Sequence, residues 1–303
     1  MEESVGCETV LIFDTCKPII GVVHLPPLPG SPAYKRRLYP GRIGRKWSID
    51  EIYEYAVEEA RKYQEAGFDA VIIENYGDMP YSMQANIGEA ASMASIAREV
   101  ARKVDIPVGI NILRNSGYEA LYAAYIARAG FVRVNSLCEY RIAVEGMLSP
   151  NLPALAKALS ELNAYDALES GALSILADVN VKHSWPLLEK ASLEDLVLEC
   201  LSRAGFPIKG VIVTGARTGS VPSKDHVSRL KKALKGRDAL LLVGSGITTE
   251  NLGEYWRLAD GFIVGTSVKL GGRTENVVSV DRAKKFIDVV KRYREVWPCT
   301  KSR

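Results

Sequence analysis

Apolar runs and amphipathic stretches alternate along the whole chain. Eight runs are rich in Val, Ile and Leu and stop at Gly or a polar residue, which is typical of strands buried in a parallel sheet. They cover residues 18–24, 70–75, 108–113, 132–135, 173–181, 210–214, 239–244 and 261–265. Stretches with helical spacing separate them, at residues 49–66, 87–104, 118–129, 152–162, 193–204, 225–234, 250–257 and 281–293.

The repeated strand–helix unit decides the fold class. Parallel strands need helical crossovers, and eight such units favour a closed barrel over an open sheet. We therefore predict an α/β protein, a (β/α)8 TIM barrel, in which residues 1–303 form one domain. A long loop is expected after the first strand and an insertion after the fourth.

Two glycine-bearing segments stand at the ends of the last two predicted strands. They read LLLVGSGIT at 240–248 and GFIVGTSVK at 261–269. In (β/α)8 barrels the loops after strands 7 and 8 commonly bind phosphate, because free backbone N–H groups converge there. We predict phosphate binding; the alternative is a pair of tight turns without a ligand. The predicted phosphate-binding residues are Gly244, Ser245, Gly246, Gly265, Thr266 and Ser267.

Polar residues recur at every second position near the ends of the predicted strands. Asp178, Asn180 and Lys182 share one face of the fifth strand, and Arg133 and Asn135 share one face of the fourth. Since side chains alternate between the barrel interior and the helices, these faces are expected to point inward at the catalytic mouth. The alternative is that the charges only neutralise one another in the interior. The same rule brings in His24, Glu74, Asn111 and Thr214.

Four of these residues are candidates for catalysis: His24, Glu74, Asp178 and Lys182. Glu74 and Asp178 would serve as acid and base, while Lys182 or Arg133 would stabilise developing negative charge. A Schiff base at Lys182 is the weaker alternative, since a neighbouring Asp favours the charged amine. His24 would either transfer protons or simply bind a carboxylate. By alternation, His183 is expected to point away from Lys182 and pack against a helix.

Substrate contacts are predicted from the remaining inward residues and from two loops. Arg217 lies in a flexible GARTG segment, for which a simple turn is the alternative. Residues 35–46 contain six Lys or Arg and no acid, so they form either a lid over an anionic ligand or a solvated basic loop. The predicted substrate-binding residues are Asn111, Arg133, Asn135, Thr214 and Arg217.

No metal or cofactor is predicted. Asp78, in ENYGD, either orients its loop or ligates a metal. A metal-dependent hydrolase built on His24, Glu74 and Asp178 is a further alternative, but the chain lacks the HxH or HExxH spacing of such sites.

Composition excludes several classes of protein. A net charge of +3, from 39 basic and 36 acidic residues, argues against a dedicated nucleic-acid binder. No apolar stretch reaches the roughly 18 residues of a membrane span, and the acidic N-terminus lacks a secretory signal. We predict a cytoplasmic protein that binds a small phosphorylated ligand, with homo-oligomerisation left open. The five cysteines form no CxxC pair, so ordinary thiols are expected, although the thermophile-like composition leaves a disulfide open.

Several segments together resemble one known family. They are PIIGVVHLPPLPGSP at 18–32, DAVIIENYGDMPY at 69–81, GINILRN at 109–115, FVRVN at 131–135, ADVNVKHS at 177–184 and VIVTGARTG at 211–219. With the two glycine segments, they make the chain resemble the BtpA/SgcQ family over almost its whole length. HLPPLPG and ENYGD are the most specific pieces. The segment SLCEYRIAV at 136–144 departs from the family pattern, since it lacks the Asp-Gln-Gly loop expected before Glu145.

The resemblance implies a barrel of the ribulose-phosphate-binding type. Cyanobacterial members of the family are associated with photosystem I biogenesis, and others are labelled as sugar-metabolism or nucleoside-processing enzymes. Two hypotheses follow. The protein is an isomerase, lyase or nucleosidase acting on a small sugar- or nucleoside-phosphate-like substrate, or it is a non-catalytic assembly factor for membrane protein complexes. The charged barrel mouth favours the enzyme, because buried ions are a poor source of stability alone.

Overall fold

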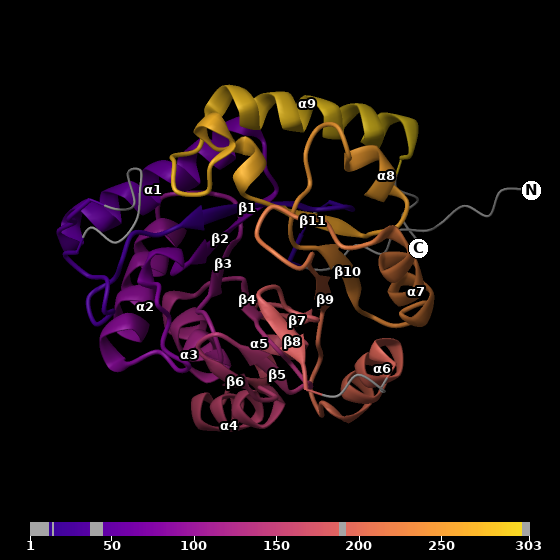
Figure 1. The fold of residues 1–303 in the computed structure, drawn as a ribbon, viewed down its shortest axis with the longest axis horizontal. Helices are drawn as coiled ribbons and strands as arrows, with labels where there is room; N and C mark the ends of the chain where they lie inside the picture. Colours follow the sequence, from indigo (N-terminus) through magenta and orange to yellow (C-terminus); the bar gives the residue numbers. More distant parts are fainter. Residues whose placement is uncertain (1–11, 14, 37–44, 188–191, 299–303) are drawn as a thin grey trace, which may run out of the picture.

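The computed structural model describes residues 12–13, 15–36, 45–187 and 192–298. Eight parallel strands within these ranges close into a barrel in the order β1-β11-β10-β9-β7-β4-β3-β2 (Figure 1). Their bounds are β1 Ile19–His24, β2 Ala70–Glu74, β3 Val108–Asn111, β4 Phe131–Val134, β7 Ser174–Val179, β9 Gly210–Val213, β10 Leu240–Val243 and β11 Gly261–Val264. The predicted TIM barrel is confirmed, and each strand lies close to its predicted position.

Helices surround the barrel on its outside (Figure 1). They are α1 Ile49–Ala66, α2 Ile87–Ala101, α3 Gly117–Ala127, α4 Leu152–Leu162, α5 Tyr165–Glu169, α6 Leu193–Arg203, α7 Lys224–Ala233, α8 Leu252–Trp256 and α9 Val280–Val296. In α1, Ser48 and Glu51 form a reciprocal capping box at the start, and Gly67 ends the helix with a φ of 93°. The sequence did not predict the short α5 or three single-turn 3-10 helices, which are η1 Tyr76–Asp78, η2 Thr266–Val268 and η3 Leu270–Gly272.

The strand side chains divide between two apolar clusters. In β1, Ile20 and Val22 pack inside the barrel, while Ile19 and Val23 pack between the strands and the helices. Leu176 of β7 belongs to the interior cluster, so Asp178, two residues further on, lies on the same inward face. Apolar layers therefore fill the barrel, and the polar layer lies above them at the carboxyl ends of the strands.

A second, three-stranded sheet was not predicted. β5 Arg141–Ala143 pairs antiparallel with β6 Gly146–Leu148 on one side and with β8 Ser184–Pro186 on the other. β5 and β6 lie in the predicted insertion after β4, and β8 follows β7, so the sheet joins the loops of two neighbouring barrel strands. Strands of three residues are too short to show a period in the sequence.

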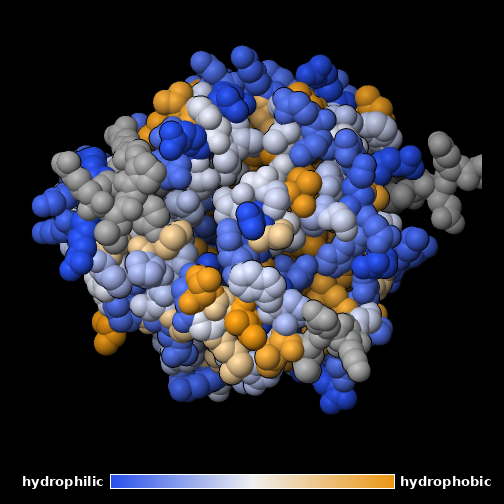
Figure 2. Space-filling model, in the orientation of Figure 1, coloured by the Kyte–Doolittle hydropathy of each residue, from blue (hydrophilic) through white to orange (hydrophobic). Residues whose placement is uncertain are grey.

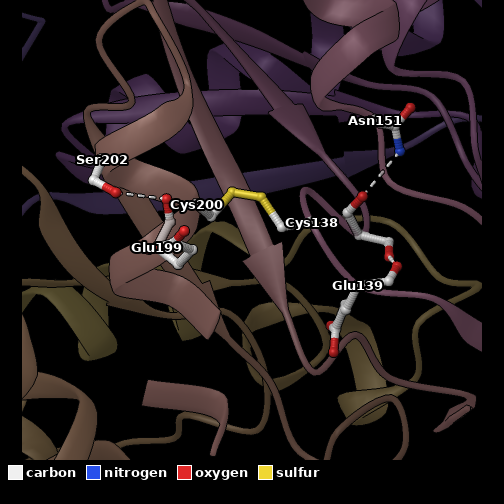
Figure 3. The surroundings of a disulfide bond; sticks show 7 residues. Cys138, Glu139, Asn151, Glu199, Cys200 and Ser202 are labelled. Carbon is white, nitrogen blue, oxygen red and sulfur yellow. Dashed lines mark hydrogen bonds between the residues drawn. A yellow bond between two sulfur atoms is a disulfide. The ribbon is translucent and has the colours of Figure 1, made fainter. Parts of the chain in front are cut away.

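A disulfide ties the same region to the outer helices. Cys138, in the loop after β4, is bonded to Cys200 of α6, at a sequence separation of 62 residues (Figure 3). The expectation of ordinary thiols is wrong for this pair, and Cys16 is also disulfide-bonded. The two Cα atoms lie 6.0 Å apart, which is typical of a disulfide, although nothing in their sequence spacing indicates it.

Two surface predictions have different outcomes. Among the helices of the described ranges, none is both long enough and apolar enough to cross a membrane.

The basic loop at 35–46 falls largely on residues 37–44, which lie outside the described residues, so the lid stays a prediction. At its end, Arg45 pairs with Glu51 of α1 at 2.8 Å.

Candidate functional site

A pocket of about 450 Å³ opens at the carboxyl ends of the barrel strands. The six predicted phosphate-binding residues line one part of it; residues 244–246 and 265–267 are called the clamp below. His24, Glu74, Arg133 and Lys182 line the other part, which we call the deep end. The structure thus brings the two halves predicted from the sequence into one cavity.

The glycines of the clamp allow close backbone packing. A Cβ on Gly246, whose φ is +74°, would lie 2.4 Å from the carbonyl carbon of Ser220. A Cβ on Gly265 would lie 2.9 Å from Cε1 of His24. Gly246 therefore requires glycine, whereas a side chain at Gly265 would have to displace the ring of His24, so Gly265 joins the clamp directly to the deep end.

The hydroxyl groups of the clamp are used within the loops. Ser245 Oγ accepts from the N–H of Gly215 at 2.9 Å and donates to the carbonyl of Ser220 at 2.7 Å. Ser267 Oγ donates to the carbonyl of Ile247 at 2.8 Å. These bonds fix the shape of the clamp and use both serine hydroxyls within the loops.

Two cations of α9 were not predicted but line the pocket beside the clamp. Arg282 and Lys285 are three residues apart in the first turns of the helix, which places them on one side of it. Arg282 Nε also donates to the carbonyl of Ser267 at 3.0 Å. The sequence held a signal for them, because the helix after the eighth strand begins beside the phosphate loops of such barrels.

Ion pairs organise the deep end. Arg133 donates to both oxygens of Asp178, from Nε at 3.1 Å and from Nη2 at 3.0 Å. Its Nη1 lies 3.8 Å from Glu74 Oε2. Burial alone would lower the pKa of Arg133, but Asp178 and Glu74 outweigh it and raise that pKa. The guanidinium is therefore a permanent positive charge at the wall of the pocket.

Several predicted site residues lie behind the pocket wall. Asp178 is fully buried and does not line the pocket; Asn135 Nδ2 also donates to it. Asn111 Nδ2 donates to the backbone carbonyl of Arg133 at 3.0 Å. Thr214 Oγ1 accepts from the N–H of Lys182 at 3.1 Å. These residues hold Arg133 and Lys182 in position rather than face the cavity.

Lys182 reaches the pocket by a different route from the predicted one. β7 ends at Val179, and Asn180 has a φ of 55°, so the strand alternation stops before Lys182. The prediction that Asp178, Asn180 and Lys182 share one strand face is therefore wrong beyond Asp178. Burial lowers the pKa of Lys182, with Glu74 opposing and Arg133 reinforcing the effect. Among the described residues, no ion pair joins Lys182 to Asp178, whose oxygens are occupied by Arg133.

His24 is a neutral imidazole at the wall of the pocket. Its Nε2 lies 3.8 Å from Glu74 Oε1, too far for a hydrogen bond, and its Nδ1 has no partner among the described residues. Burial lowers its pKa well below the usual value, and Lys269, Lys182 and Arg133 lower it further.

Lys269 is a buried lysine that the sequence analysis did not predict as part of the site. Its Nζ lies 4.0 Å from Glu59 Oε2, and burial lowers its pKa to about 8.

The predicted Arg217 does not line the pocket. Its side chain is exposed, while its neighbours Thr218 and Gly219 reach the cavity. His183 is not among the residues that line the pocket, and where packing against a helix was predicted, its Nε2 lies 2.9 Å from Thr218 Oγ1 in the loop after β9.

The profile of the BtpA family matches residues 15–292. The chain belongs to the BtpA family. An uncharacterized protein of Pyrococcus abyssi is 45% identical to it over 278 residues, which cover 92% of this chain and 97% of that protein. The photosystem I biogenesis protein BtpA of Synechocystis is 32% identical, over 92% of this chain and 89% of that protein.

Solved structures share the fold of this BtpA-family chain. KGPDC from Streptococcus mutans superposes with a TM-score of 0.53 at 14% identity, covering 92% of this chain and 99% of that one. N-(5'-phosphoribosyl)anthranilate isomerase from Pyrococcus furiosus gives 0.50 at 14% identity, covering 91% and 99%. Such low identities show the common barrel only.

The two most specific sequence pieces of the BtpA resemblance pack against each other. A Cβ on Gly77, in ENYGD, would lie 2.5 Å from the backbone nitrogen of Pro27 in HLPPLPG. Asp78 accepts from the N–H of Leu28 at 2.7 Å and from Asn75 Nδ2 at 2.9 Å. Burial raises the pKa of Asp78 to about 7, against these hydrogen bonds. Asp78 thus orients the proline loop, and no His, Cys, Asp or Glu cluster of metal-binding size occurs among the described residues.

Proposed function

We propose that this barrel is an enzyme that acts on a small sugar- or nucleoside-phosphate-like substrate by acid–base chemistry. The observation that carries the proposal is that one pocket has two chemically different ends. The clamp, with Arg282 and Lys285, suits a phosphoryl group that does not react. The deep end holds a carboxylate, two cations and a neutral imidazole, which suit proton transfer.

Glu74 is the general base in this proposal. It lines the pocket, whereas Asp178 is bound on both oxygens by Arg133 and is withdrawn from the cavity. Proton abstraction from a carbon beside a carbonyl or ribosyl centre would leave negative charge on the substrate, which Arg133 and Lys182 would stabilise. We assign Asp178 the role of positioning Arg133. The reaction class is that of an isomerase, lyase or nucleosidase.

His24 complements Glu74 in this scheme. As a neutral imidazole beside the base, it adds no charge to the resting site, and it would become an imidazolium on accepting a proton from the substrate or from Glu74. A Schiff base at Lys182 remains the weaker alternative. Burial lowers the pKa of the amine, as that chemistry needs, but the carboxylate of Glu74 acts in the opposite direction.

A non-catalytic assembly factor is the competing function, and it rests on the name of the Synechocystis relative. The buried charges favour the enzyme. Arg133 is held by two carboxylates at the wall of a cavity, an arrangement that costs desolvation and brings little stability of its own.

Phosphate binding at the clamp can be tested with inorganic phosphate. We expect titration calorimetry to show binding to the wild type and at least about a tenfold loss of affinity in Lys285→Gln, because one charge-assisted contact is removed. Lys284→Gln is the matched control. That neighbouring lysine pairs with Glu65 at 2.7 Å on the outside of the helix and should leave affinity unchanged.

The chemical step needs a second experiment. Native mass spectrometry of protein purified without added ligand should reveal a retained phosphorylated compound, and Glu74→Gln should bind it but not turn it over. An empty site that also ignores inorganic phosphate would overturn the clamp. Full turnover by Glu74→Gln would overturn only the assignment of the base.

A further inference from the structure

The small sheet presents an apolar outer face. In the ladder, Ile142 of β5 lies directly opposite Met147 of β6 and Trp185 of β8. Their exposed fractions are 47%, 55% and 61%, which are high for large apolar side chains. We call the apolar face the set of exposed residues on and beside this sheet: Tyr140, Ile142, Val144, Met147, Trp185 and Leu187.

The six residues lie on the three strands or directly beside them. Tyr140 immediately precedes β5, and Val144 begins the turn that joins β5 to β6. Val144 is 83% exposed. Leu187 directly follows β8 and donates its N–H to the carbonyl of Tyr140 at 3.2 Å, which holds these two residues together. In Figure 2 hydrophobic colours gather over the region of β5, β6 and β8.

The inner face of the sheet is already satisfied within the chain. Ala143 and Leu148 pack with Val181 in a buried apolar cluster. Arg141 pairs with Glu139 at 3.0 Å and donates from Nε to Ser184 Oγ at 2.6 Å. The apolar side chains on the outer side of the sheet are therefore not needed for packing against the barrel.

The size of the apolar face fits a protein interface. From the exposed fractions, the six residues together expose about 700 Å² of surface, with their backbone and polar atoms included, and the largest apolar patch of a typical monomer covers roughly 300–600 Å². Each partner in a standard protein interface contributes about 800 Å². Other exposed apolar side chains, such as Ile87, Ile126 and Leu270, are on separate elements.

We propose that the apolar face binds the same face of a second copy of this chain, in a twofold dimer. The six residues that define the face are all uncharged, so the face needs a partner that is apolar at the matching positions. An identical face meets that need by symmetry, and two sheets can stack with their side chains interdigitated. An anionic membrane would instead favour a surface that carries lysine or arginine.

Dimerisation would also brace the candidate site. β8 begins two residues after Lys182, and Leu187 and Trp185 belong to the same segment. A partner that packs on β8 therefore limits the movement of the segment that delivers Lys182 to the pocket. This interface does not depend on the identity of the substrate.

The oligomeric state tests the proposal directly. We expect light scattering after gel filtration to give the mass of a dimer for the wild-type chain, and of a monomer for Ile142→Glu and for Trp185→Ala at the same concentration. Sedimentation should show at least about a 100-fold rise in the dimer dissociation constant for each variant, as for central interface residues. Ile126→Glu is the matched control: this residue of α3 is 62% exposed, lies outside the apolar face and should leave the dimer intact.

Circular dichroism melting should show that Ile142→Glu and Trp185→Ala stay folded, because both side chains are exposed. A monomeric wild type overturns the proposal, and so does a dimer that survives both substitutions. A wild-type monomer that co-sediments with phosphatidylcholine vesicles would also overturn it, because the face would then belong to a bilayer.

Discussion

Arg133 binds both carboxylate oxygens of Asp178, at 3.1 and 3.0 Å, and both side chains are almost completely buried. Removing Asp178 leaves the buried guanidinium with only Glu74, 3.8 Å away, to balance its charge. We expect Asp178→Ala to lower the free energy of unfolding by about 3–5 kcal/mol in urea denaturation. Glu254→Ala, which breaks an exposed pair with Lys224, should cost less than about 1 kcal/mol. Equal losses in the two variants would contradict this account.

The clamp makes a prediction about glycine. Gly246 and Gly236 have φ values of +74° and +78°, but only Gly246 is crowded, since a Cβ on Gly236 would meet nothing within 4 Å. Gly236→Ala should therefore show the cost of the backbone conformation alone, about 1 kcal/mol. Gly246→Ala should lose more stability and should also weaken inorganic phosphate binding. Calorimetry and thermal melting of the two variants measure both effects.

His24 gives the stability of the fold a dependence on pH. Because burial and three nearby cations lower its pKa, the folded chain keeps His24 neutral at pH values where the unfolded chain, with a pKa near 6.5, is already protonated. This contribution is complete above pH 6.5 and is lost as the pH falls below it. We expect the free energy of unfolding to fall by up to about 1.4 kcal/mol per pH unit from this group. His24→Asn should lack that part of the slope; identical slopes would show that His24 titrates normally.

The disulfide should stabilise the fold measurably. Cys138 and Cys200 close a loop with a sequence separation of 62 residues. A cross-link of that span restricts the unfolded chain, and its loss costs about 2–4 kcal/mol. We therefore expect Cys200→Ala to melt at a lower temperature than the wild type under non-reducing conditions. A melting temperature unchanged by Cys200→Ala would mean that the two thiols are not joined in solution.

The sequence predicted the barrel because its strands and helices are long enough to show their periods. The alternation rule also placed Glu74, Arg133 and Asp178 in one polar layer, since all three lie on or at the end of a regular strand. It failed at Lys182, where Asn180 takes a left-handed conformation that no periodicity encodes. The alternation rule gives the side of the strand that a residue faces, but not whether its side chain reaches the cavity. It could not predict that Arg133 lies between Asp178 and the pocket.

Other features depend on distances through space. The pairing of Cys138 with Cys200 and the pairing of β5 with β8 each join segments far apart in the chain. No local pattern announces such contacts. Arg282 and Lys285 could have been predicted as pocket residues from the sequence. The predicted last helix contains both of them and begins beside the clamp.

The contact of Gly77 with the proline loop limits how the site can be rebuilt. The backbone of Pro26 and Pro27 occupies the space that any side chain at position 77 would need, and Leu28 depends on the carboxyl group of Asp78. If HLPPLPG is moved into another barrel without ENYGD, it loses the backbone contact with Gly77 and the hydrogen bond to Asp78. The two segments should be exchanged between relatives together, as one cassette.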